Sequence, residues 1–143
     1  MTRVLSPMVI GLGLLTAGWL VWACKDDLSG DGTVDIVFPD TGVSYGKHVE
    51  PLFLRACALP GCHTRESKSD AGDLSLESYQ DALSKSGVIV LGTTHGDTVS
   101  SRMVWSLEGL HGVPRMPPIG RPRLTENQIR GIKQWIWEGA KNN

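Results

Sequence analysis

The chain has 143 residues, a formal net charge of -1 and 41% hydrophobic residues. This length suits one ordinary domain, and the nearly balanced charge gives no large basic surface of the kind that binds nucleic acid. The sequence contains no phosphate-binding glycine loop and no serine-hydrolase elbow, so no motif supports a phosphate-cradling or serine-hydrolase function.

The first segment, residues 1–24, is predicted to export or anchor the protein. Arg3 is the only charged residue before Lys25, and a helix over the apolar run between them would span roughly 30 Å, enough to cross a bilayer. The run is either a retained transmembrane helix with Arg3 inside, or a lipoprotein signal in which V-W-A-C ends at a lipidated Cys24. Simple secretion is a third alternative. Both leading alternatives tether the domain to the outer side of a bacterial membrane.

Residues 25–43 are predicted to form an acidic, glycine-rich linker. The stretch from Asp27 to Asp35 partly resembles a calcium-binding loop. The position that needs a bidentate glutamate is Phe38, however, so a solvated acidic tether is the better interpretation.

Residues 44–57 are predicted to form the first helix, because their apolar residues recur at helical spacing. Pro51 disfavours a helical start much before Glu50, or bends the helix there. The stripe consists of Val49, Leu52, Phe53 and Ala56.

The middle of the chain is predicted to contain only short elements. We expect a weak helix over residues 76–83, an extended loop over 88–91, and a helix capped by Asp97 or Thr98 that runs to about Leu107. Residues 109–123 hold four prolines and three glycines, which excludes a helix or a central strand there.

The last helix has the clearest signals. Thr125 and Gln128 form a capping box, and Gly139 marks the end. The order helix, loop, helix, loop, helix predicts a small all-α domain over residues 44–143. The buried stripe of this last helix consists of Leu124, Ile129, Ile132, Trp135 and Ile136.

The sequence C-A-L-P-G-C-H places Cys57 and Cys62 just before His63. In the C-x-x-C-H signature, two cysteines form thioether bonds to haem and the adjacent histidine binds the iron. Here four residues separate the cysteines, so the extra residues must loop outwards, which Pro60-Gly61 allows. A plain Cys57–Cys62 disulfide is the main alternative. A zinc site is a weaker one, because the other histidines are scattered.

The region from Val43 to Ala140 resembles the bacterial family of single-haem cytochrome c domains. The similar segments are V-S-Y-G-K-H-V-E-P-L-F-L-R-A-C, G-D-L-S-L-E-S-Y, G-T-T-H-G-D-T-V-S-S-R-M-V and R-M-P-P, followed by a terminal helix that ends W-I-W-E-G-A. The resemblance implies a cytochrome c-like fold around one covalent haem c. It makes His63 the proximal ligand of the iron and Met116 the distal ligand.

The residues around these ligands leave some alternatives open. Met116 lies in a proline-stiffened loop that can hold a thioether over the iron with little entropy to lose. His111 in the same loop is a rival ligand, as is Met103 in the preceding helix. The side chains expected to pack against the porphyrin are Phe53, Trp135 and Ile136, and those expected to pair with its propionates are Arg115, Arg121 or Arg123.

The function expected from the resemblance is the transfer of single electrons between redox proteins. An iron with both a histidine and a methionine ligand leaves no position for a substrate. The protein would be a mobile carrier or a fixed subunit of a respiratory or photosynthetic complex, with no small-molecule substrate and no nucleic-acid partner. The alternatives are a haem enzyme or gas sensor with an open iron site, and a haem-free exported module with a disulfide.

Overall fold

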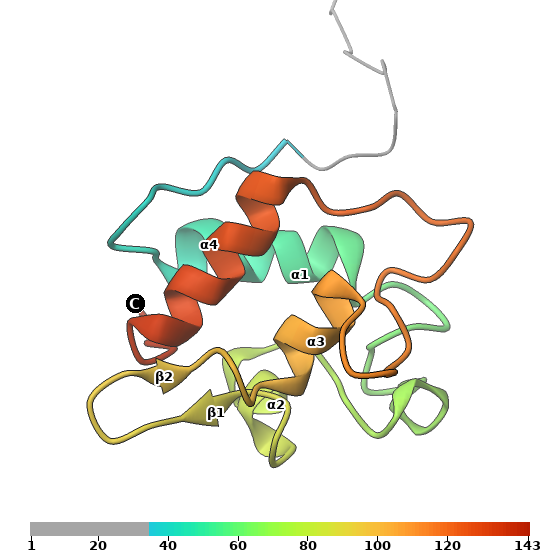
Figure 1. Cartoon of the computed structure of the whole chain (residues 1–143). Coiled ribbons are helices and arrows are strands. Elements are labelled where there is room, and N and C mark those ends of the chain that lie inside the picture. The colour runs from blue at the N-terminus through green and yellow to red at the C-terminus, as the bar shows by residue number, and fades with distance from the viewer. Residues whose placement is uncertain (1–34) are drawn as a thin grey trace, which may run out of the picture.

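The computed structural model describes residues 35–143. The predicted anchor 1–24, with Cys24, and residues 25–34 of the linker lie outside this range. Among the described residues, no helix is both long and apolar enough to cross a bilayer. The elements are η1 (Tyr45–Val49), α1 (Glu50–Ala56), η2 (Lys68–Ala71), α2 (Tyr79–Ser84), β1 (Val90–Leu91), β2 (Gly96–Asp97), α3 (Arg102–Glu108) and α4 (Glu126–Trp137) (Figure 1).

The predicted first helix is present as two joined pieces. A π-helical turn, η1, precedes α1, and Pro51 lies in the first turn of α1, where its missing N–H costs no intrahelical bond. The hydroxyl of Ser44 caps η1 by accepting a hydrogen bond from the backbone N–H of Lys47 at 3.3 Å. Val49, Leu52 and Phe53 of the predicted stripe are buried.

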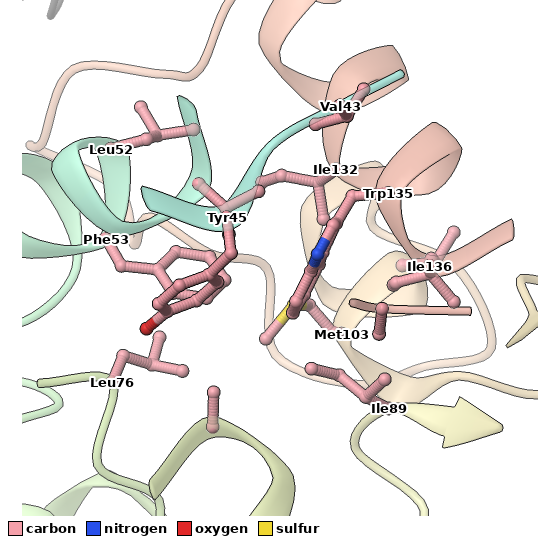
Figure 2. Packing of buried hydrophobic residues seen from close by; sticks show 14 of the residues in the cluster. Val43, Tyr45, Leu52, Phe53, Leu76, Ile89, Met103, Ile132, Trp135 and Ile136 are labelled. Atoms are coloured by element: carbon pink, nitrogen blue, oxygen red, sulfur yellow. The ribbon is translucent and has the colours of Figure 1, made fainter. Parts of the chain in front are cut away.

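Helix α4 confirms the local signals read from the sequence. The Gln128 N–H donates to the Thr125 hydroxyl, the Gln128 side chain accepts from the Thr125 N–H, and Gly139 follows the end of the helix. Ile132, Trp135 and Ile136 are fully buried. Figure 2 shows Ile132 and Trp135 facing side chains from η1 and α1, with Met103 and Ile89 beside them.

Helix α3 begins later than predicted. Its N-cap is Ser101, not Asp97 or Thr98. Gly96 and Asp97 instead form β2, which pairs antiparallel with β1 in register Val90↔Asp97. The Asp97 carboxylate accepts hydrogen bonds from the backbone N–H groups of Val99 and Ser100 at 2.8 and 2.9 Å, so it caps this turn and does not accept from the N–H groups that begin α3.

The expected extended loop 88–91 is therefore partly a strand, whose Val90 N–H donates to the Ser101 hydroxyl at 2.9 Å.

The weak helix predicted over 76–83 is also shifted: α2 begins after Ser78, whose hydroxyl accepts from the Asp81 N–H at 3.2 Å. Residues 109–123 contain no helix or strand, as predicted. With short helices and one two-stranded ladder, the cytochrome c-like all-α class remains a prediction.

The end of the predicted linker belongs to the packed domain. Phe38 is buried and its ring lies against Gly131 of α4, where any side chain would collide with it. Asn127 bonds both backbone groups of Phe38, accepting from its N–H at 2.8 Å and donating to its carbonyl at 3.0 Å. Val43 is also buried. Packing therefore begins at about Phe38, upstream of the boundary at residue 44 that the composition suggested.

Candidate cofactor site

A cavity of about 310 Å³ lies among α1, α3, α4 and the loops that follow α1 and α3. In Figure 1 those two loops, green after α1 and orange after α3, lie on the same side of the molecule. The wall is mainly apolar, and it includes one thiol, one imidazole and two thioethers. The lining residues are Phe53, Cys57, His63, Asp70, Ala71, Gly72, Leu74, Leu76, Lys85, Val88, Arg102, Met103, Ser106, Leu107, Val113, Pro114, Met116 and Ile132.

A tight turn connects the two cysteines. The N–H of Cys57 donates to the Phe53 carbonyl at 2.9 Å, which extends α1, and the N–H of His63 donates back to the Cys57 carbonyl at 3.1 Å. Gly61 adopts φ +76° in this turn, a conformation that other residues rarely reach. Pro60 and Gly61 are exposed, so the additional residues of the motif do loop outwards.

The two cysteines differ in position. Both are free thiols, but only Cys57 lines the cavity. Burial raises the pKa of the Cys57 thiol to about 12, with a smaller contribution from the nearby Cys62. Cys57 is therefore an uncharged thiol at neutral pH.

His63 is held in one tautomer by its neighbours. Its Nδ1 lies 3.1 Å from the Leu74 carbonyl oxygen, and its own carbonyl accepts from the Leu76 N–H at 2.8 Å. Because a carbonyl only accepts hydrogen bonds, Nδ1 carries the proton in that contact. The other ring nitrogen, Nε2, then keeps its lone pair, as in a metal-binding histidine that is oriented by a hydrogen bond through its second nitrogen.

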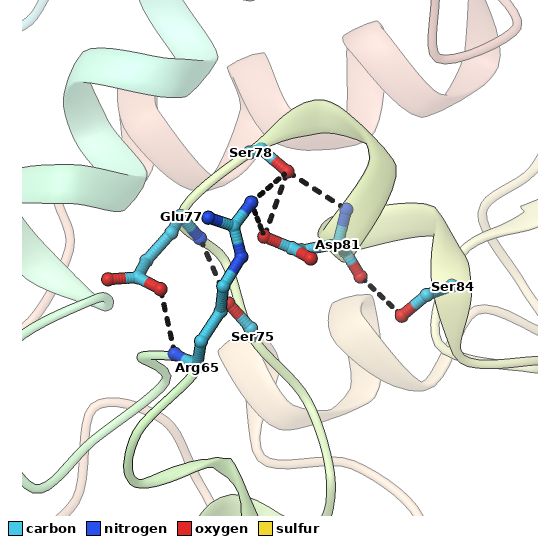
Figure 3. Close-up of polar contacts among 6 residues, drawn as sticks. All are labelled: Arg65, Ser75, Glu77, Ser78, Asp81 and Ser84. Atoms are coloured by element: carbon cyan, nitrogen blue, oxygen red, sulfur yellow. Dashed lines mark hydrogen bonds and ion pairs between the residues drawn. The ribbon is translucent and has the colours of Figure 1, made fainter.

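A polar network fastens the chain just after His63 to the start of α2 (Figure 3). The Arg65 N–H donates to the Glu77 carboxylate at 2.7 Å, and its guanidinium donates to Ser78 at 3.3 Å and pairs with Asp81 at 2.8 Å. Burial acts to raise the pKa of Asp81, but the hydrogen bonds from Ser78 and Arg65 and the charge of Arg65 outweigh it and lower that pKa. The segment that follows His63 is thus fixed to the start of α2.

Of the three rivals for the distal position, two line the cavity. Met116 does so from the proline-rich loop, where its N–H donates to the Ser106 carbonyl at 2.9 Å. Met103 does so from α3, but it also belongs to the hydrophobic core (Figure 2). His111 does not line the cavity, and its ring lies 4.5 Å from that of Trp105.

The two predicted aromatic residues occupy different layers. Phe53 lines the cavity. Trp135 does not: it lies behind Phe53, with its ring 6.3 Å away in an edge-to-face arrangement, and its indole N–H donates to the Lys141 carbonyl at 2.9 Å. Ile136 is also outside the lining, and Ile132 takes its place. Trp135 therefore supports the wall from the core and does not form it.

The charged residues at the cavity are not those expected. None of Arg115, Arg121 and Arg123 lines it, whereas Lys85 and Arg102 do. Neither lies near the cysteine motif in sequence, and nothing in the local pattern marks them. Only the tertiary structure brings them to the cavity.

The donor set of the site fits a covalently bound haem. An apolar cavity offers one imidazole nitrogen with a lone pair, a thioether and a thiol, which match the iron and the vinyl edge of a porphyrin. Cys62 lies outside the lining, immediately before His63 in the exposed turn. Within residues 35–143, no three histidine, cysteine or acidic side chains form a group that could hold a metal ion.

Comparison with known proteins gave no relative. No protein-family model, curated protein or solved structure matches this chain significantly. The resemblance to single-haem cytochrome c domains therefore remains a prediction from the sequence motifs.

Proposed function

We propose that this chain is a single-haem c-type cytochrome that transfers single electrons between redox proteins. The observation that carries the proposal is the meeting of Cys57, His63 and Met116 at one apolar cavity. Cys57 and His63 are close in sequence, but Met116 comes from a distant loop. A protein with a disulfide and no cofactor has no need for such a cavity, whereas a haem domain requires one.

Attachment assigns separate roles to the two cysteines. Cys57 and Cys62 would hold the haem through thioether bonds to its two vinyl groups, an addition of S–H to a double bond that would need no oxidant. Cys57 already lines the cavity. Cys62 does not line it but directly precedes His63, in a turn whose tip, Pro60-Gly61, is exposed.

The remaining residues hold the iron and exclude water. His63 offers Nε2 while the Leu74 carbonyl fixes its ring, and Met116 offers its thioether from a loop anchored to Ser106. When bound, the haem supplies a one-electron iron couple. If His63 and Met116 both bound the iron, that couple would suit electron transfer rather than substrate binding. Phe53, Leu74 and Leu76 keep the site apolar.

The setting proposed for this activity is the bacterial cell envelope. The predicted anchor lies in residues 1–24, with Cys24 as its lipid-bearing residue in the lipoprotein alternative, so the haem domain would be outside the cytoplasm. Its partners would be redox proteins, either soluble or within a membrane complex. No small-molecule substrate is needed for this role.

The test is to produce the full chain in a bacterium that matures c-type cytochromes and to analyse the membrane-extracted protein. The pyridine haemochrome spectrum should show covalent haem, and the ferric protein should show the near-infrared charge-transfer band of methionine ligation. Replacing Cys57 and Cys62 with serine should abolish covalent attachment. Cys24→Ser is the matched control, because it removes the third cysteine and should leave the haem in place.

Two methionine variants test the distal ligand. Met116→Leu should remove the near-infrared band, whereas Met103→Leu should keep it, because only the first removes the proposed ligand. A colourless protein from a strain that matures a control cytochrome would refute the proposal. Covalent haem without the band in the unsubstituted protein would favour an open-site enzyme or sensor instead.

A further inference from the structure

Two basic side chains from different elements border the cavity. Lys85 follows the end of α2, and Arg102 is the first residue of α3. Both line the cavity, and the only other lining residue with a formal charge at neutral pH is Asp70. The lining therefore carries one more positive than negative charge.

Within residues 35–143, neither cation forms an ion pair with a carboxylate. The ion pairs found among residues 35–143 are Arg65–Asp81 and Lys133–Glu108, so Lys85 and Arg102 are not paired with a carboxylate there. The ammonium of Lys85 donates a hydrogen bond to the Gly72 carbonyl, which is an uncharged acceptor. An ammonium has three N–H donors and a guanidinium five, so both retain donors for a ligand.

The backbone holds these two residues in a defined relation. The Arg102 N–H donates to the Gly87 carbonyl at 3.0 Å, and the Met103 N–H donates to the Val88 carbonyl at 3.0 Å. These bonds join the start of α3 to the segment that directly follows Lys85. The two cations therefore reach the same cavity from adjacent, hydrogen-bonded segments.

We propose that Lys85 and Arg102 bind the propionate carboxylates of the haem, an assignment that rests on the proposed function. A haem is an apolar disc with two carboxylates on one edge, and this cavity combines an apolar wall with two cations that form no ion pair within the described part of the chain. Charge-assisted hydrogen bonds from lysine or arginine to a carboxylate are stronger than those between neutral groups. Arginine adds a planar fork that matches both carboxylate oxygens.

The test measures the reduction potential of the haem-loaded protein as a function of pH. The potential falls with rising pH where a propionate ionises, because the negative charge favours the ferric state. A nearby cation lowers the pKa of a carboxyl group by about 1–3 units. Lys85→Gln or Arg102→Gln should therefore move this fall to higher pH by about one unit or more. His63, Cys57 and Asp70 are the other titratable groups at the cavity, and these variants leave them unchanged.

The matched control is Arg55→Gln, which removes one exposed cation from α1 outside the cavity. It should retain the unsubstituted profile, as should Arg102→Lys, which keeps the charge. If all variants carry covalent haem and the methionine band but share one profile, the propionate assignment is overturned and the proposed function stands. If the unsubstituted protein carries no haem, both are overturned.

Discussion

Tyr45→Phe and Tyr79→Phe, made separately, each remove one hydroxyl group, and the two hydroxyl groups differ in their hydrogen bonding. Tyr79 donates its hydroxyl hydrogen to the Ala140 carbonyl at 2.9 Å. Tyr45 is only 2% exposed, and its hydroxyl has no hydrogen-bond partner in the described part of the chain. The two rings pack edge to face, 5.2 Å apart, so the two substitutions change the same region of the core.

The expected effects on stability have different signs. Tyr79→Phe should lower the free energy of unfolding by about 1 kcal/mol, the net value of a typical hydrogen bond. Tyr45→Phe should leave that free energy unchanged or raise it by roughly 1 kcal/mol, because the unfolded state no longer gains hydration of a hydroxyl that the fold leaves unpaired. Chemical denaturation followed by circular dichroism at neutral pH measures both values.

Alkaline pH provides a second readout. Burial raises the pKa of Tyr45 to about 12, with smaller contributions from Glu50, Asp81 and Tyr79. Because the folded protein keeps the proton while the unfolded chain loses it near pH 10, stability should fall between about pH 10 and pH 12. A difference of two pKa units between the folded and unfolded states corresponds to a loss of roughly 3 kcal/mol in the free energy of unfolding. Tyr45→Phe should remove this component. Equal losses of stability in the two variants, with the alkaline fall unchanged, would refute the reasoning.

Three further substitutions test other contacts by denaturation. Gly131→Ala should destabilise the fold by about 1–3 kcal/mol, despite a better helix propensity, because the methyl group would occupy the position of the Phe38 ring; unchanged stability would show that this ring is not packed there. Glu138→Gln should weaken the attachment of residues 42–43 to the end of α4, because the Glu138 carboxylate accepts hydrogen bonds from their N–H groups at 2.7 and 2.9 Å. Burial acts to raise the pKa of Glu138, but the hydrogen bonds from the Gln134 amide and from these two N–H groups, with the charge of Lys141, outweigh it and lower that pKa. The contribution of Glu138 should therefore be present above the ordinary carboxyl pKa and disappear as pH falls through the lowered value; an identical acid profile in the variant would contradict this. Arg65→Gln should cost at most about 1 kcal/mol, because the arginine side chain is 64% exposed, yet it should broaden the NMR signals of the segment after His63 by releasing Asp81; sharp, unshifted signals would argue against that positioning role.

Elements whose signals are local were predictable from the sequence. The capping box at Thr125 joins residues three positions apart, so any helix that starts there satisfies both groups. Pro51 restricts the start of α1 through its own ring. The cysteine and histidine residues of the candidate site share one turn, and this closeness is visible in the printed sequence.

Elements that depend on distant partners were not predictable. The start of α3 was misplaced because Asp97 is a residue type that commonly caps helices. In the structure its backbone pairs with β1, and its carboxylate accepts a hydrogen bond from the Val99 N–H in a turn. Phe38 looked like part of a linker because its partner, Gly131, lies far along the chain on α4. Trp135 lies on the buried stripe of α4 and was expected to line the cavity. Phe53 lies between it and the cavity and forms the wall instead.

The amino-acid sequence indicated the candidate residues for haem attachment and ligation, because Cys57, Cys62 and His63 are neighbours and Met116 lies in a loop stiffened by prolines. Only the folded chain shows that Met116 shares a cavity with His63, and that Lys85 and Arg102 border this cavity while three arginines closer to Met116 in the chain do not. Residues that are neighbours in the chain meet through local geometry. Residues far apart meet only when buried apolar faces bring their elements together.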